Sequence, residues 1–222
     1  MKTKDYVILI SCSLFLGWVL TSSKFDGKPV VKNTVKPVVI DTPIIHNVKD
    51  KTVLFIGDSH TANKDFGWQQ QLCKITGMKG RNVSVGGKMT PWMLSMAQKH
   101  LDSSYDYCFV YGGANDCYSL VSVEKTIVNI QAIADLCNAK GVKCVVLTGF
   151  DPLTCVRVNS NYPQLYSKLQ RMMLAQLRDC QVVDCRKAVV RKNCWDNICH
   201  MNYDGHKNMA NCIVDSCKFK RF

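Results

Sequence analysis

The chain has 222 residues, 47% of them apolar, and its 29 Lys and Arg against 17 Asp and Glu give a formal net charge of +12. This length fits one domain of ordinary size plus a terminal segment, and the apolar fraction is enough for a real core, so no disulfide scaffold is needed to explain folding. The positive charge favours anionic partners such as acidic polysaccharides, phospholipid head groups or nucleic acid. Because the basic residues are dispersed and no zinc-finger or RNA-binding motif occurs, nucleic acid is not expected; a solvated basic surface without a specific partner is the alternative.

Residues 1–23 differ from the rest of the chain. Lys2 and Lys4 precede an uncharged, mostly apolar run from Tyr6 to Leu20. This pattern predicts a signal anchor with its basic end in the cytoplasm; a cleaved signal peptide is the close alternative, although no clear cleavage site follows. Either segment would put the rest of the chain in an exported compartment, where it is membrane-anchored or secreted.

Residues 24–50 are predicted to form a tether rich in Pro, Val and Lys. The sequence KPVV at 28–31 recurs at 36–39. Prolines at this density favour extended chain and interrupt helices.

From residue 51 onward, apolar runs typical of strands alternate with segments of helical periodicity. Strands are expected at Thr52–Ile56, Arg81–Val85, Tyr107–Tyr111, Val142–Leu147 and Val182–Val183. Helices are expected at Phe66–Ile75, Pro91–His100 with Thr90 as its N-cap, Val123–Ala139, Gln164–Leu177 and Gly205–Cys217. This alternation implies an α/β fold with a parallel sheet covered on both faces, in which ligands bind beyond the carboxyl ends of the strands.

The chain has 13 cysteines, and three pairs share the spacing C-x4-C, at 180/185, 194/199 and 212/217. This is not a zinc pattern, because no C-x2-C pair occurs and the histidines are not arranged beside the cysteines. We expect some disulfides, most of all in the C-terminal third, whereas Cys108 and Cys144 lie in apolar runs where a cysteine acts as a small hydrophobe. No cofactor is expected, since P-loop and dinucleotide-binding glycine motifs are absent from the sequence.

Three candidate site residues, Ser59, Gly87 and Asn115, lie just past the ends of predicted strands, and His200 follows late in the chain. A serine hydroxyl becomes a nucleophile when a base lies within hydrogen-bond reach, and histidine with an acid behind it is suited to that role. Gly87 can bring its backbone N–H close to a developing oxyanion, and Asn115 can donate from its amide. The ordered set predicts a serine hydrolase.

The motifs around these residues resemble those of the SGNH (GDSL-type) hydrolase family. They are GDS at 57–59, GG at 86–87, GAND at 113–116 and HMNYDG at 200–205. The resemblance covers about residues 51–215 and implies an SGNH-type hydrolase domain over 51–222. The implied fold is a three-layer α/β/α sandwich, similar to flavodoxin, with a parallel sheet of about five strands.

Carried over residue by residue, the resemblance implies Ser59 as nucleophile and His200 as general base and then acid. It implies an oxyanion hole made of the Ser59 N–H, the Gly87 N–H and the Asn115 side chain. No metal or cofactor is implied.

The acid behind His200 departs from the family pattern. The family places it three residues before the histidine, where this chain has Asn197, and Asp196 stands four residues before. We expect Asp196 to take the role through one extra loop residue, with an uncharged Asn197 as the alternative. A disulfide between Cys194 and Cys199 would reshape this loop and account for the spacing.

Other polar residues near the motifs are expected to have minor roles. His60 is interpreted as pocket lining or as unimportant, and His206 as structural. Asp58 and Asp116 are expected to bond local backbone, and Asp204 is a weaker candidate for the acid because it follows the histidine.

The resemblance implies a serine ester hydrolase that works through an acyl-enzyme. With the basic surface and the export signal, we expect it to act on small acyl esters, above all acetyl esters, of a surface polysaccharide or glycan. A membrane-tethered acyltransferase to polysaccharide is the first alternative. A glycan-binding module without turnover is the second.

Overall fold

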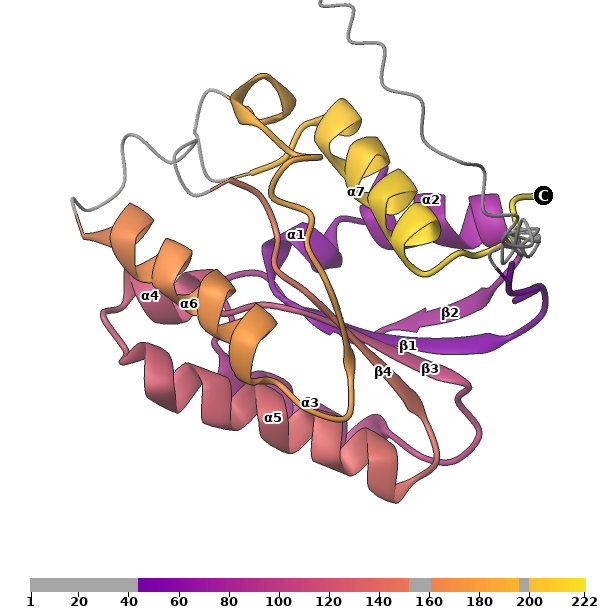
Figure 1. Ribbon diagram of the computed structural model, residues 1–222, viewed down its shortest axis with the longest axis horizontal. Coiled ribbons are helices and arrows are strands. Elements are labelled where there is room, and N and C mark those ends of the chain that lie inside the picture. Colours follow the sequence, from indigo (N-terminus) through magenta and orange to yellow (C-terminus); the bar gives the residue numbers. More distant parts are fainter. Residues whose placement is uncertain (1–43, 152–160, 196–199) are drawn as a thin grey trace, which may run out of the picture. The chain divides into compact units, whose positions relative to one another are not determined.

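Five parallel strands form the centre of the structure, a computed structural model that describes residues 44–151, 161–195 and 200–222 (Figure 1). The strands are β1 (Thr52–Gly57), β2 (Lys79–Asn82), β3 (Tyr107–Tyr111), β4 (Lys143–Leu147) and β5 (Gln181–Val183). Their order in the sheet is β2-β1-β3-β4-β5, and every neighbouring pair is parallel. The signal segment and most of the tether predicted from the sequence lie outside the described residues.

The central strands are apolar along nearly their whole length because both faces of the sheet are covered. β3 is buried at all five positions, and β1 is buried from Val53 onward. The edge strand β2 has the sequence KGRN and is exposed throughout. The core therefore lies around β1, β3 and β4.

Helices cover the two faces of this sheet, as Figure 1 shows. One face carries α2 (Trp68–Thr76) and α7 (Tyr203–Ser216), and the other carries α3 (Thr90–His100), α5 (Val123–Ala139) and α6 (Tyr162–Gln176). Two short helices, α1 (Ser59–Ala62) and α4 (Ala114–Tyr118), directly follow β1 and β3, and a 3-10 turn, η2, spans Arg191–Asn193. The predicted three-layer α/β/α fold with a five-stranded parallel sheet is confirmed.

Two local predictions are wrong. The strand expected at Arg81–Val85 is β2 at Lys79–Asn82, because Asn82 ends it by donating from Nδ2 to the carbonyl of Thr61 at 2.6 Å and accepting from the Ser84 N–H at 3.0 Å. Thr90 is the first residue of α3 and not its cap, since its hydroxyl instead donates to the Asp116 carboxylate at 2.6 Å.

Cysteines of the C-terminal third are unpaired where the structure describes both members of a predicted pair. Cys180, Cys185, Cys212 and Cys217 are free thiols, so neither 180/185 nor 212/217 forms a disulfide. The apolar core holds the domain together without them. Cys199 lies outside the described residues, and with it the proposed bond to Cys194.

The first and last described segments meet at the edge of the sheet where the strands begin. His46 forms a parallel bridge with Phe219, and Lys220 N–H donates to the His46 carbonyl at 2.9 Å. Within the part of the chain that the structure describes, no helix has the length and apolar character needed to cross a membrane.

Candidate active site

Ser59 lies at the tip of β1, where the strand turns at once into α1. Asp58 caps this helix, since its Oδ1 accepts from the His60 N–H at 3.0 Å, and Ser59 is the first helical residue. Gly57 allows the sharp turn, because a Cβ there would overlap Thr61 and the carbonyl of Tyr111. The turn holds the half-buried Ser59 at the carboxyl edge of the sheet.

His200 meets Ser59 across 141 residues of sequence. Its Nε2 lies 3.0 Å from the Ser59 Oγ, which is hydrogen-bond distance. A bridge between Cys194 and Met201 and a hydrogen bond of 2.8 Å from the Trp195 N–H to the His200 carbonyl hold the backbone here. Burial lowers the pKa of His200 below its ordinary value of 6.5, so the ring is neutral near pH 7 and able to accept a proton.

Asn115 and Gly87 approach the same edge from β3 and from the loop after β2. The Asn115 Nδ2 donates to the carbonyl of Lys88 at 3.1 Å, which ties the two segments together. Gly87 has φ +72°, and a side chain added there would meet nothing within 4 Å. Its N–H therefore lies in an open, exposed loop beside the site, in a conformation that favours glycine.

Asp116, the residue after Asn115, anchors α4 to the start of α3. Its buried carboxylate accepts from the Thr90 N–H at 3.0 Å and from the Thr90 hydroxyl at 2.6 Å. Asn129 on α5 donates to the same hydroxyl at 3.1 Å. The expectation of a local backbone role for Asp116 is thus wrong, because this carboxylate links α4 to the start of α3, 26 residues earlier.

Ser59, Asn115 and His200 line a cavity of about 220 Å³. It is lined by Asp58, Ser59, His60, Ala114, Asn115, Tyr118, Tyr162 and His200. Tyr162 is almost completely buried, whereas Tyr118 is 60% exposed and lies at the opening. The cavity is small and polar at the serine, with aromatic rings around it.

The ring of His60 packs near the rings of two other histidines, His200 and His206. The His60 ring lies 5.3 Å from that of His200 and 6.5 Å from that of His206, measured between centroids. Burial lowers the pKa of His206 to about 4, with a contribution from His200, and its Nδ1 accepts from the Trp68 N–H at 3.1 Å. His206 is therefore a neutral structural residue, as its place on α7 suggested.

Asp58, the residue before Ser59, also lines the cavity and is fully buried. Burial raises the pKa of its carboxyl to about 7, against the opposing effect of the His60 N–H hydrogen bond. Its Oδ2 has no hydrogen bond among the described residues. Asp58 therefore caps α1 through Oδ1 and makes no hydrogen bond to the His200 ring among the described residues. This agrees with the local backbone role expected for it.

The model of the GDSL-like Lipase/Acylhydrolase family matches residues 55–207, more than half of the chain and the whole region that carries these side chains. The chain belongs to this family. It is an SGNH-type esterase, and the predicted family is confirmed. No curated protein sequence matches the esterase closely enough to be called a relative.

Solved structures with the same fold share little sequence with this esterase. A G-D-S-L family lipolytic protein from Veillonella parvula has a TM-score of 0.65 at 14% identity, over 74% of this chain and 97% of its own. The acetylxylan esterase Axe2 from Geobacillus stearothermophilus has a TM-score of 0.62 at 14% identity, over 77% and 96%. The psychrotrophic esterase EstA from Pseudoalteromonas sp. has 0.58 at 16%, over 76% and 97%. At such identities the likeness shows the fold alone.

The structure of the esterase brings together Ser59, His200, Asn115 and the loop of Gly87 from distant parts of the sequence. Asp196 and Asn197, the two candidates for the acid, lie outside the described residues. Within the described ranges, no group of three or more His, Cys, Asp or Glu side chains is placed to hold a metal ion.

Sequence analysis missed Tyr118 and Tyr162 as pocket residues, whereas His60 lines the cavity, which was one of its two expected roles. Tyr118 stands three residues after Asn115, so a short helix starting at Ala114 would have brought it to the opening. Tyr162 begins α6 two residues before the predicted start and follows residues outside the described ranges, so its sequence carried no such signal.

Proposed function

We propose that this esterase hydrolyses small acyl esters, above all acetyl esters, through a covalent acyl-enzyme on Ser59. The observation that supports this most is the distance of 3.0 Å between the Ser59 Oγ and the His200 Nε2 at the wall of a small cavity. A neutral histidine at that distance can take the serine proton as the oxygen attacks the ester carbonyl.

In the first half of the reaction, the Ser59 Oγ bonds to the carbonyl carbon and His200 accepts the proton. The tetrahedral intermediate then collapses, the bond to the alcohol oxygen breaks, and His200 protonates the departing alcohol. In the second half, water attacks the acyl-serine with His200 again as base. Asp196 is proposed to orient His200 and to stabilise its charged form.

The oxyanion is proposed to receive hydrogen bonds from the Ser59 N–H, the Gly87 N–H and the Asn115 side chain. The Asn115 amide nitrogen carries two hydrogens, and the Lys88 carbonyl takes only one. The Ser59 N–H lies at the first residue of a helix and points away from the helix's own carbonyls.

Cavity size and surface charge support an acetylated glycan as the substrate. A volume of about 220 Å³ is below the roughly 300–1,000 Å³ of sites that enclose whole drug-sized ligands, so only the acyl group and its ester bond need enter. The exposed Tyr118 ring offers an apolar surface to a sugar at the opening. The net charge of +12 favours an acidic polymer, and one neighbour in fold is an acetylxylan esterase.

The proposal includes a location outside the cytoplasm. Residues 1–23 are proposed to anchor the esterase to a membrane or to export it, and residues 24–50 to act as a tether. Protease protection of the full chain in sealed membranes tests this, since a cytoplasmic domain would be digested from the opposite side.

The decisive experiment measures hydrolysis of acetyl, butyryl and octanoyl esters of p-nitrophenol by the full chain in mild detergent. Ser59→Ala and His200→Ala should each lower kcat by roughly a thousandfold or more. Ser95→Ala and His100→Ala, both on α3 away from the cavity, should keep parent activity. Equal rates in all variants would refute the proposed nucleophile and base.

Two further arms separate the alternatives. With an oligosaccharide acceptor added, the product should still be the free acid, formed by transfer of the acyl group to water. An acylated sugar as the product would instead identify a transferase. Asp196→Ala should lower kcat by roughly a hundredfold or more while Asn197→Ala changes it little, and the reverse result would assign the orienting role to Asn197.

A further inference from the structure

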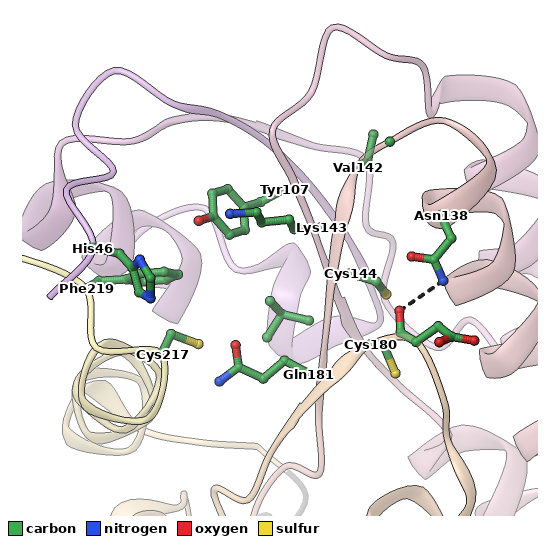
Figure 2. A pocket seen from close by; sticks show the side chains of 13 residues that line it. His46, Tyr107, Asn138, Val142, Lys143, Cys144, Cys180, Gln181, Cys217 and Phe219 are labelled. Atoms are coloured by element: carbon green, nitrogen blue, oxygen red, sulfur yellow. Dashed lines mark hydrogen bonds between the residues drawn. The ribbon is translucent and has the colours of Figure 1, made fainter. Parts of the chain in front are cut away.

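A second cavity, far from Ser59, opens where the strands begin (Figure 2). Its volume is about 490 Å³, and it lies between the start of β3, β4 and β5 and the ends of α5 and α7. Two of the side chains that line it are the thiols of Cys144 on β4 and of Cys180, just before β5, and Figure 2 shows both facing the cavity.

Cys180 directly precedes β5, and a hydrogen bond between its thiol and that of Cys144 makes the two side chains neighbours. The β4–β5 ladder begins with the pair Val145 and Gln181, and Cys144 and Cys180 are the residues immediately before this pair. Adjacent parallel strands lie about 4.8 Å apart, which falls within the roughly 4.4–6.8 Å between Cα atoms that a disulfide spans.

Cys144 belongs to a row of thiols across the sheet. It is the register partner of Cys108 on β3, and Cys137 on α5 packs against both. Cys108 and Cys137 are completely buried, so Cys180, which is half-buried and lines the cavity, is the member of this row that solvent reaches.

Side chains of α5 fix the backbone that carries Cys180. Asn138 Nδ2 donates to the Asp179 carbonyl at 2.9 Å, which Figure 2 marks, and Gln131 bonds both the N–H and the carbonyl of Arg178. Asp179 is held at φ +55°. The thiol of Cys180 is therefore positioned against Cys144 by packing and not left on a loose loop.

The environment makes the two thiols unequal. A hydrogen bond from Cys144 lowers the pKa of the Cys180 thiol, whereas hydrogen bonds with Cys137 and Cys180, together with burial, raise that of Cys144. The thiolate is the nucleophile in thiol–disulfide exchange. Cys180 is thus suited to attack and Cys144 to follow.

We propose that Cys180 and Cys144 form a redox-active pair that a small disulfide such as glutathione disulfide oxidises through this cavity. The Cys180 thiolate attacks one sulfur of the oxidant, whose S–S bond breaks and releases one glutathione thiolate. Cys144 then loses its proton and attacks the Cys180 sulfur, which expels the second glutathione. Two cysteine thiols are oxidised to one disulfide, and the oxidant is reduced to two thiols.

Charges at the rim of the cavity suit an oxidant that carries carboxylates. The Lys143 ammonium lies 5.5 Å from the centre of the Tyr107 ring, and His46 lies on the same wall. Asp179 is the one acidic side chain among the lining residues. The bond would fasten the start of β5, which among the described strands pairs with β4 alone, to the rest of the sheet.

The experiment treats the reduced full chain with glutathione disulfide, blocks remaining thiols and maps peptides by mass spectrometry. All arms carry Cys212→Ser, because hydrogen bonding from Cys185 lowers the pKa of the Cys212 thiol to about 7 and would give a competing reaction. We expect a Cys144–Cys180 cross-link in the parent and a persistent glutathione adduct on Cys180 in Cys144→Ser. In Cys180→Ser, Cys144 should stay reduced.

Cys73 is the matched control, since it is also half-buried but burial raises its pKa to about 11. It should react at least roughly tenfold more slowly than Cys180, because far less of it is thiolate. Hydrolysis of p-nitrophenyl acetate at parent rates verifies that each variant is folded. A Cys180 that stays reduced, or that pairs with a cysteine other than Cys144, would overturn the proposal.

Discussion

The Asn115 side chain is held directly by a backbone carbonyl of the loop after β2, and its neighbour Asp116 is anchored to α3. The Lys88 carbonyl accepts from the Asn115 side chain, and the neighbouring Asp116 is bound to Thr90, which Asn129 also contacts. Such preorganised donors stabilise charge in a transition state because they need no rearrangement when the charge forms.

We therefore expect Asn115→Ala to lower kcat on a small acetyl ester by roughly a hundredfold to a thousandfold with little change in KM. Steady-state kinetics on the purified variant measure this. Asn211→Ala is the control and should match the parent, because this half-buried asparagine on α7 does not line the cavity and its side chain bonds only Arg221 among the described residues. A loss confined to KM would mean that Asn115 binds the ester and does not stabilise the oxyanion.

His200 gives a prediction on pH. Since burial lowers its pKa, the base remains neutral at mildly acidic pH and becomes protonated only below its ordinary 6.5. The acid limb of kcat/KM for a neutral ester should therefore have its midpoint below pH 6.5. A pH profile of p-nitrophenyl acetate hydrolysis checks this, and a midpoint above that value would contradict it.

Asp58 and His206 affect stability with opposite signs. The folded-state pKa of His206 is lowered to about 4, so the unfolded chain binds more protons and stability is lost as pH falls from 6.5 towards 4. The folded-state pKa of Asp58 is raised to about 7, so the folded chain binds more protons and stability is lost as pH rises from 3.8 towards 7.

Asp58→Asn removes the second effect and keeps an oxygen to cap α1. Between about pH 4.5 and 7, the free energy of unfolding of this variant should rise on the order of 3 kcal/mol more than that of the parent. Urea titrations at the two pH values measure the difference. Asp65→Asn, at an exposed position, should follow the parent; an Asp58 variant with the parent's pH dependence would show that the carboxyl is not destabilised by burial.

At the scale of elements, two short helices present the site residues, and each depends on one special residue before it. α1 follows the Asp58 cap, and α4 follows Gly113, which has φ +97°. A Cβ on Gly113 would overlap the buried Leu169 on α6 and press on Thr126 on α5. α4 can therefore lie close to α5 and α6 only because this position is glycine.

Gly113→Ala should cost more stability than Gly141→Ala. Both glycines have positive φ, +97° and +71°, so both substitutions carry the backbone cost of roughly 1–2 kcal/mol. Only Gly113 adds an overlap, since nothing lies within 4 Å of a Cβ at Gly141. Thermal and urea unfolding of the two variants give the comparison, and equal losses would mean that Leu169 moves aside freely.

Sequence patterns located long or strongly apolar elements well, and short or polar elements poorly. β1 and β3 are apolar throughout and α5 is long and periodic, so their positions were predictable. β2 has the sequence KGRN and was placed two residues late, because its partner strand and not its own side chains determines it. α1 and α4 are too short to show a period, so the pocket residue Tyr118 carried no clear signal, whereas His60 could be expected to line the pocket because it follows Ser59 directly.

At the scale of the whole molecule, the chain has 29 basic against 17 acidic residues, and the cavity at Ser59 is small, with Asp58 as its one acidic lining residue. Long-range attraction then acts on a polymeric anion but not on a small neutral ester. Raising NaCl from about 0.05 to 0.5 M should lower kcat/KM on an acetylated acidic polysaccharide roughly tenfold, because salt screens charges beyond a few ångströms.

Hydrolysis of p-nitrophenyl acetate under the same conditions is the control and should change less than about twofold. If both substrates respond alike, the salt acts on the fold or on the site itself. If neither responds, the basic surface plays no part in substrate capture.

The pairing of His46 with Phe219 determines which way the active site would face if the enzyme were attached to a solid support. Both ends of the described domain leave from the edge where the strands begin, and Ser59 opens at the edge where they finish. A label, bead or fusion partner joined at either end would therefore lie at the edge of the sheet opposite the Ser59 cavity. An array of such molecules, grafted by Phe222 to a solid support, would present every opening to the liquid.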